Sequence, residues 1–162
     1  MALHEGLSAG DRTSRPTVKK ISAGEITVTR TFSDRFDLEL GPMIPVADAF
    51  NVIVQMRDFE AHRLWRRGEL VYEGGHSKAS LAITDLRDQW QCHHLSPFDN
   101  VRFHIPFSCM RTFTERAGRG EYVSLSPVQG RVDPVMFGLA QALLPSLDEP
   151  DRANLLFVEQ IN

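Results

Sequence analysis

Hydrophobic and polar residues alternate along most of the first two-thirds of the chain, which is typical of β-strands with one buried face. In residues 25–32, Ile26, Val28 and Arg30 alternate with three threonines. Gly or Pro residues punctuate the short runs that follow, which cover 50–57, 61–66, 69–72, 79–84, 89–94 and 101–105. Such a series of short strands predicts an antiparallel sandwich or closed barrel, and it disfavours a parallel α/β sheet.

Glycines mark two predicted turns between these strands. Gly68 is expected to lead from one strand into the next, and Gly74-Gly75 is the strongest turn signal in the chain. The sequence after Gly74 lacks the spacing and the lysine of a phosphate-binding loop. We therefore interpret residues 74–76 as a tight β-turn.

Residues 89–94 and 101–105 are predicted to pair as a hairpin across the turn-forming residues 95–100. Burial decides the register, because a slip of one residue would scatter the apolar side chains over both faces. The favoured register pairs Trp90 with Ile105, Cys92 with Phe103, and His94 with Val101. These side chains then form an inner face, and the polar outer face consists of Gln91, His93, Arg102 and His104.

After residue 106 the period changes to that of an α-helix. Apolar residues recur at helical spacing over 107–117, and residues 119–132 are expected to form a loop. Asp133 then supplies an N-cap and Pro134 a first-turn proline for a second helix, which is expected to end before Pro145. A third helix is predicted from about residue 148 to the end of the sequence.

These elements predict a mainly β fold with C-terminal helices, in which a β-barrel or jelly roll is followed by two to three α-helices. Residues 1–24 are expected to form a flexible N-terminal arm, because they are polar and rich in Gly and Ser. The barrel is expected to span 25–106. Residues 107–162 are expected to form a helical segment that packs on the barrel.

Charge and composition exclude several classes of protein. The chain has 18 Lys and Arg against 21 Asp and Glu, a net charge of −3 at pH 7, whereas a DNA-binding surface needs concentrated positive charge. Two cysteines, Cys92 and Cys109, are too few for a disulfide framework. No apolar run approaches the ~18 residues of a membrane span. We therefore expect a reduced, cytoplasmic protein that makes no membrane contact and does not hold DNA by itself.

The histidines are not spaced as metal ligands are in barrels of this kind. His93 and His94 are adjacent, so they point to opposite faces of a strand, and no two histidines lie two residues apart. Cys109 has no recognisable histidine partner motif, and no acid–base set of carboxylates stands out. We therefore expect no metal, no cofactor and no enzymatic activity.

Several short motifs carry a family resemblance over residues 45–162. They are Arg57-Asp-Phe59, His62-Arg-Leu-Trp65, Gly74-Gly-His76, Asp85-Leu86, the segment His94-Leu-Ser-Pro-Phe-Asp-Asn100, Phe103, Ile105-Pro106, Asp133-Pro-Val135 and Leu143-Leu-Pro145. Together they resemble the N-terminal regulatory domain of one branch of bacterial AraC-type transcriptional regulators.

The resemblance implies a cupin-like β-barrel that senses a small-molecule effector and forms a homodimer. In such regulators DNA is bound by a C-terminal domain of two helix-turn-helix units, and no such pattern occurs in these 162 residues. The alternative is a free-standing, metal-dependent enzyme of the cupin type, which the missing histidine pair disfavours. A protein-interaction module with a filled barrel also remains open.

The predicted effector site is the inner face of the barrel. Its residues are Trp90, His94, Trp65, His62, Cys92 and Phe103, an aromatic wall with imidazoles that suits a small planar or hydroxylated molecule. The same side chains would also serve as ordinary core residues, and the sequence leaves both interpretations open. Only Arg57 looks placed to meet a charge, so a polyanionic ligand is not expected.

The C-terminal helices present apolar stripes that either pack on the barrel or form a dimer interface. We favour the interface, because a β-domain with its own core has little need of them for burial. The residues predicted to dimerise are Met136, Leu139, Leu143, Leu156, Phe157 and Ile161.

Overall fold

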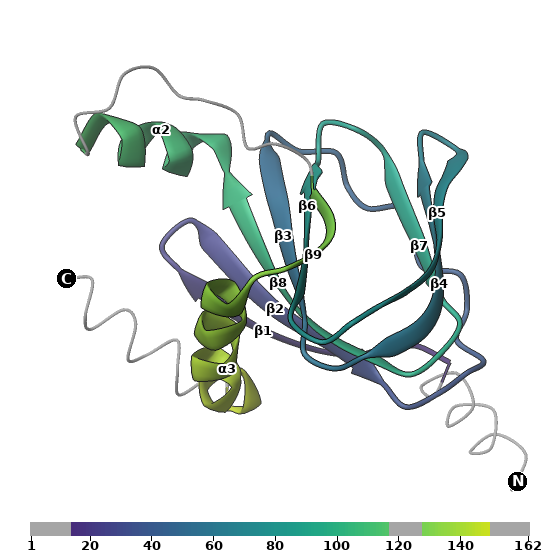
Figure 1. The fold of residues 1–162 in the computed structure, drawn as a ribbon. Helices are drawn as coiled ribbons and strands as arrows, with labels where there is room; N and C mark the ends of the chain where they lie inside the picture. The colour runs from purple at the N-terminus through teal and green to yellow at the C-terminus, as the bar shows by residue number, and fades with distance from the viewer. Residues whose placement is uncertain (1–13, 117–127, 150–162) are drawn as a thin grey trace, which may run out of the picture.

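The computed structural model describes residues 14–116 and 128–149, in which strands form two sheets that face each other and helices lie outside them (Figure 1). The elements are β1 (Thr17–Ala23), β2 (Ile26–Ser33), β3 (Ala49–Gln55), β4 (Phe59–Arg66), β5 (Glu69–His76), β6 (Ser80–Asp85), β7 (Trp90–His94), β8 (Phe98–Pro106), α2 (Phe107–Arg116), β9 (Val128–Val132) and α3 (Pro134–Asp148). All strand pairs in the two sheets are antiparallel.

The order of the strands identifies the fold. The larger sheet has the order β1-β2-β8-β3-β6-β9, and the smaller sheet has the order β5-β4-β7. The segment before β3 also pairs with β7, because the amides of Gly41 and Ile44 donate to the carbonyls of Cys92 (3.0 Å) and Trp90 (2.9 Å).

The eight strands of the barrel are β2, the segment 41–44, and β3 to β8, and they are numbered here from one to eight in that order. The two sheets then read 1-8-3-6 and 2-7-4-5, which is the arrangement of a jelly roll built from two Greek keys. The predicted mainly β, cupin-like jelly roll with helices after it is confirmed.

Two strands are absent from the sequence prediction. β1 lies within residues 1–24, which were expected to form an arm, and its Ile21 pairs with Val28 and is only 1% exposed. β9 lies within the expected loop 119–132 and pairs with β6 at the other edge of the sheet. Both are edge strands, β1 of seven and β9 of five residues, and the polar composition of the segments that contain them favoured an arm and a loop.

The helices mostly agree with the sequence pattern. The Asp133 carboxylate caps α3 by accepting hydrogen bonds from the amides of Val135 (3.1 Å) and Met136 (3.0 Å). The prediction that this helix stops before Pro145 is wrong, and burial of the Leu147 side chain explains the extra turn. The expected third helix lies outside the described residues. No helix among the described residues is long and apolar enough to cross a membrane.

The predicted turn at Gly74-Gly75 is wrong, since both residues lie inside β5. A Cβ on Gly75 would overlap the carbonyl oxygen of Phe59, so the glycine allows β5 to approach β4 closely beside an irregularity in their pairing. The predicted turn at Gly68 is confirmed. Arg67 and Gly68 have φ of 51° and 79°, as a two-residue hairpin turn with left-handed residues requires.

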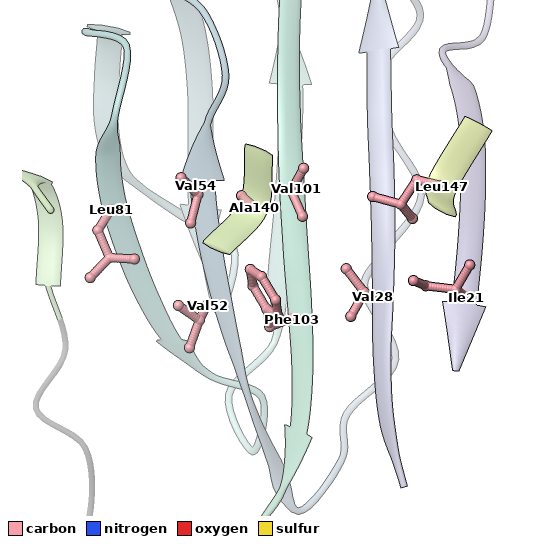
Figure 2. Close-up of a cluster of buried hydrophobic side chains, with 9 residues drawn as sticks. All are labelled: Ile21, Val28, Val52, Val54, Leu81, Val101, Phe103, Ala140 and Leu147. Carbon is pink, nitrogen blue, oxygen red and sulfur yellow. The ribbon is translucent and has the colours of Figure 1, made fainter. Parts of the chain in front are cut away.

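The main hydrophobic core lies on the outer face of the larger sheet, under α3. Val101 and Phe103 of β8 lie beside Ala140 of the helix there, and Leu147 of the helix lies over β1 and β2 (Figure 2). Burying a leucine side chain completely, as at Leu147, contributes roughly 1.5–3 kcal/mol. The other members of the cluster are Ile21, Val28, Val52, Val54 and Leu81.

This core overturns the predicted hairpin of residues 89–105. β7 and β8 belong to different sheets: β7 pairs with β4, and β8 lies between β2 and β3. Phe103 therefore faces α3, while the alternating Arg102 faces the space between the sheets. The predicted register of residues 89–105 is wrong because apolar side chains of β8 are buried under α3 as well as in the barrel interior.

Candidate functional site

The inner face of the larger sheet is polar and has Arg102 at its centre. Strand register places Thr29 of β2 and Ile53 of β3 directly beside Arg102. Polar residues form the rows on either side of it. One row is Thr31, Asn100 and Gln55, and the other is Thr27, His104 and Asn51.

Three cavities meet at Arg102 and Ile44, which border all of them. The first, about 50 Å³, lies between the two sheets and is lined by residues of β3, β6 and β8 on one side and of β4, β5 and β7 on the other. The second, about 230 Å³, has apolar walls that include Leu38 and Phe98. The third, about 420 Å³, is lined by the inner threonines of β2 together with His104. Arg102 thus borders a small space between the sheets and two larger pockets, whose linings include the exposed Glu39 and Lys20.

Arg102 has no counterion among the described residues. Its one hydrogen bond there runs from Nε to Oδ1 of Asn100 (3.2 Å), and no Asp or Glu forms an ion pair with it. Burial lowers the pKa of the guanidinium, and the nearby Cys92 thiol acts in the opposite direction. A guanidinium stays protonated in proteins, so Arg102 is a positive charge that no described carboxylate balances. The two terminal nitrogens of its guanidinium have no acceptor in the described chain.

Gln55 adds an unused hydrogen-bonding group to the first cavity. Its side chain is 5% exposed, and its Oε1 is the one buried side-chain nitrogen or oxygen of the described residues that has no partner. Gln55 pairs with Asn100 across the two strands, and Asn100 is only 1% exposed. A buried acceptor without a donor costs about 1–3 kcal/mol. The site therefore offers a donor and an acceptor that are unmatched within the described residues.

The smaller sheet contributes a cluster of imidazoles that are far apart in the sequence. The ring of His62 lies 5.5 Å from that of His94 and 5.4 Å from that of His76, between centroids. His62 Nδ1 is 2.7 Å from the carbonyl oxygen of Gly74, which fixes its ring. Within the described residues, no group of three His, Cys, Asp or Glu side chains has the geometry to hold a metal ion.

Burial keeps these imidazoles uncharged near neutral pH. It lowers the pKa of His76 to about 4 and that of His94 to about 2, with the charge of Arg102 adding to the effect at His94. The pKa of His62 is lowered as well, mainly by burial. Burial also raises the pKa of the Cys92 thiol to about 11, so this sulfur is a poor nucleophile. The cluster supplies neutral hydrogen-bonding and stacking groups.

Four of the six predicted effector residues line the first cavity: Trp90, His94, His62 and Cys92. Trp90 is fixed by its indole nitrogen, which donates to the carbonyl of Asp85 (2.8 Å). Their contact with a ligand stays a prediction.

The other two predicted residues do not reach the cavities. Phe103 packs under α3, and Trp65 is paired with Gln91 on the outward-facing side of β4, opposite to Leu64. Arg57, the one basic residue that sequence analysis considered for a charged ligand, is exposed and pairs with Asp34 (3.4 Å).

The sequence prediction did not include Arg102, Gln55 and Asn100 in the site, because the predicted hairpin has its apolar face turned toward the barrel interior. A signal was present in the sequence: residues 100–105 alternate strictly between polar and apolar, and an amphipathic helix follows that needs an apolar partner.

The predicted dimer residues have mixed surroundings. Met136 and Leu143 pack against the core of the larger sheet, so the core-packing alternative applies to them. Leu139 keeps 49% of its surface exposed, and Val135 keeps 80%. Leu156, Phe157 and Ile161 lie outside the described residues. Dimerisation stays a prediction.

No protein-family model matches the sequence, and no curated protein matches it. Among solved structures, an RmlC-like cupin family protein from Methanocaldococcus jannaschii is 8% identical, with 57% of this chain and 82% of that chain covered and a TM-score of 0.45. The cupin domain of Schizosaccharomyces pombe Cnp3 is 7% identical, with 66% and 72% covered and a TM-score of 0.43.

The AraC-like transcriptional activator CuxR is 9% identical, with 89% of this chain and 53% of that chain covered and a TM-score of 0.44. Overlap at this level says nothing about ligand or activity. By the order of its strands, the chain is a cupin-like jelly-roll domain.

Proposed function

We propose that this chain is the ligand-sensing and dimerisation domain of a bacterial AraC-type transcriptional regulator, without enzymatic activity of its own. The observation that carries the sensing role is the group of three cavities around Arg102, which forms no ion pair among the described residues. A barrel that only served packing would gain nothing from a half-buried charge at its centre that forms no ion pair among the described residues. The regulator role rests on the motifs over residues 45–162 that resemble this family.

The fold offers a route from the ligand to the outside of the barrel. Arg102 faces the cavities, and its neighbours Val101 and Phe103 on the same strand pack under α3. A ligand that draws Arg102 into one position would therefore bias the packing of α3, whose Leu139 is exposed for a partner. In this proposal the effector shifts a population of helix positions, and DNA is contacted only by a separate C-terminal domain.

The two tryptophans provide the test, because they lie on opposite faces of the smaller sheet. We expect a bound effector to change the fluorescence of the Trp65→Phe variant, which keeps Trp90 in the cavity wall. The matched Trp90→Phe variant should show little change. A metabolite screen by thermal shift would supply the ligands, and calorimetry would give their affinities.

Two results would contradict the proposal. Ligands that stabilise the protein but alter the fluorescence of Trp65 alone would place binding outside the barrel. Turnover of a bound compound by the purified chain would favour the enzyme alternative instead.

A further inference from the structure

We propose that the molecule bound in the barrel is a small hydroxylated monocarboxylate, with its carboxylate on Arg102 and a hydroxyl on Gln55. This inference rests on the proposed sensing function and names the chemical class of its ligand. It differs from the expectation drawn from the sequence, in which stacking on aromatic residues dominated and no charge was assigned.

The charge of the ligand follows from what surrounds Arg102. The guanidinium presents donors in a planar fork that matches the two oxygens of a carboxylate, and its terminal nitrogens have no acceptor in the described chain. The other charged groups that line the three cavities, Lys20 and Glu39, are exposed at the surface. Arg102 is thus the one half-buried positive charge in the lining of the three cavities, and it matches one negative charge.

A phosphate group fits this site less well. At neutral pH a phosphate monoester carries nearly two negative charges, and it is usually held by several cations or backbone amides. The imidazoles around the first cavity are uncharged because their pKa values are lowered by burial. They add hydrogen bonds but no second positive charge.

The hydroxyl group of the proposed ligand is assigned from the unmatched acceptor of Gln55. Its Oε1 accepts no hydrogen bond from the part of the chain that the structure describes, although the side chain is almost completely buried in the wall of the first cavity. Gln55 lies beside Asn100, two residues from Arg102 along β8, so its Cα is diagonal to that of Arg102 at roughly 7–8 Å. Two long side chains at this spacing meet adjacent groups of one small molecule.

The size of the first cavity restricts the group that binds there. About 50 Å³ admits roughly three to four water-sized groups, which is enough for a carboxylate and a neighbouring hydroxyl but not for a sugar ring. The rest of the molecule would extend into the second or third cavity, since both adjoin Arg102.

The test uses probes that differ by one group. Thermal shift and calorimetry on the purified chain would compare lactate and 3-hydroxybutyrate with their amides, lactate with propionate, and all of them with inorganic phosphate. We expect the hydroxycarboxylates to raise the melting temperature, and the amides, propionate and phosphate to do so much less. Arg102→Gln should weaken binding of the hydroxycarboxylates by about 30-fold or more.

Two further variants separate a lost contact from a damaged fold. Arg102→Lys keeps the charge without the planar fork and should retain part of the affinity. Gln55→Met should bind lactate and propionate equally, because the acceptor for the hydroxyl is gone. Arg57→Gln is the matched control, since Arg57 is an exposed arginine outside the cavities, and it should bind as the wild type does.

The outcomes distinguish this inference from the sensing function. If amides or sugars stabilise the wild type and Arg102→Gln alike, the sensing function stands and the carboxylate assignment is wrong. Preference for phosphate over every carboxylate would also overturn the assignment. If neither these probes nor a broad metabolite screen binds, both proposals fail together.

Discussion

Replacement of Arg102 by methionine should make the unliganded protein more stable. Exchanging a buried ion pair for apolar side chains of similar volume is often stabilising by about 1–4 kcal/mol, because the cost of desolvation disappears. Arg102 is a single, half-buried charge with one hydrogen bond among the described residues, and it borders cavities that admit water, so the lower end applies. Asn100 loses the donor at 3.2 Å, which water in the first cavity can replace.

We therefore expect a gain of about 1 kcal/mol, which corresponds to roughly 2–4 °C in melting temperature for a domain of this size. Urea unfolding followed by circular dichroism would give the free energy, and calorimetry would give the melting temperature. Arg57→Met is the control. Arg57 is exposed and its ion pair with Asp34 spans 3.4 Å, so its removal should change stability by less than about 0.5 kcal/mol.

A fall of several degrees in the melting temperature of Arg102→Met would refute this reasoning. It would mean that the guanidinium is already satisfied within the folded chain and that its role is structural. The combination we expect, higher stability with lost ligand binding, is characteristic of residues retained for function at the expense of stability.

Three further predictions concern other parts of the fold. Gly75→Ala should destabilise the protein by about 1–3 kcal/mol in urea unfolding, because the added Cβ would meet the Phe59 carbonyl. The control Gly138→Ala, on the exposed face of α3, should stabilise the protein by about 0.5–1 kcal/mol. Equal effects of the two substitutions would contradict the close approach of β5 to β4. Leu139→Glu should convert a dimer into a folded monomer in sedimentation experiments, and a monomeric wild type would refute the predicted interface. The free energy of unfolding should fall as the pH drops from 6.5 towards 4, because His76 and His94 take up protons in the unfolded chain but stay neutral in the folded protein. Each of the two imidazoles can contribute up to ~1.4 kcal/mol per pH unit to this dependence. Urea unfolding at several pH values should show a weaker pH dependence for His76→Gln than for the wild type.

The elements that the sequence predicts correctly are those whose signals are local. Alternation over five to eight residues marks most of the strands of the barrel, and the pair Asp133-Pro134 marks the start of α3 because a cap acts within one turn. The Gly68 turn is similar, since the left-handed conformation is a property of the turn itself. Such signals do not depend on which strands meet.

The errors concern choices that depend on distant parts of the chain. Residues 89–105 contain two strands and a turn, and nothing within them shows that the turn crosses from one sheet to the other. Which face of β8 is inside depends on α3, more than thirty residues later, because α3 determines where Val101 and Phe103 find apolar contacts. The Gly74-Gly75 pair permits either a turn or a close approach of strands, and only the pairing with β4 decides between them.

The main core lies on the outer face of the larger sheet, and this position leaves the polar inner face of β8 for the ligand that we propose. A jelly roll whose strands turn their apolar faces inward fills its own barrel, and specificity then has to come from loops at the rim. Here Val101 and Phe103 of β8 are buried under α3, so the alternating Asn100, Arg102 and His104 are not needed for that core. Along β8, the residues that pack in the core therefore alternate with the residues that line the cavities. Substitutions at Val101 or Phe103 should act mainly on folding, and those at Arg102 mainly on ligand affinity, although the residues are adjacent in the chain.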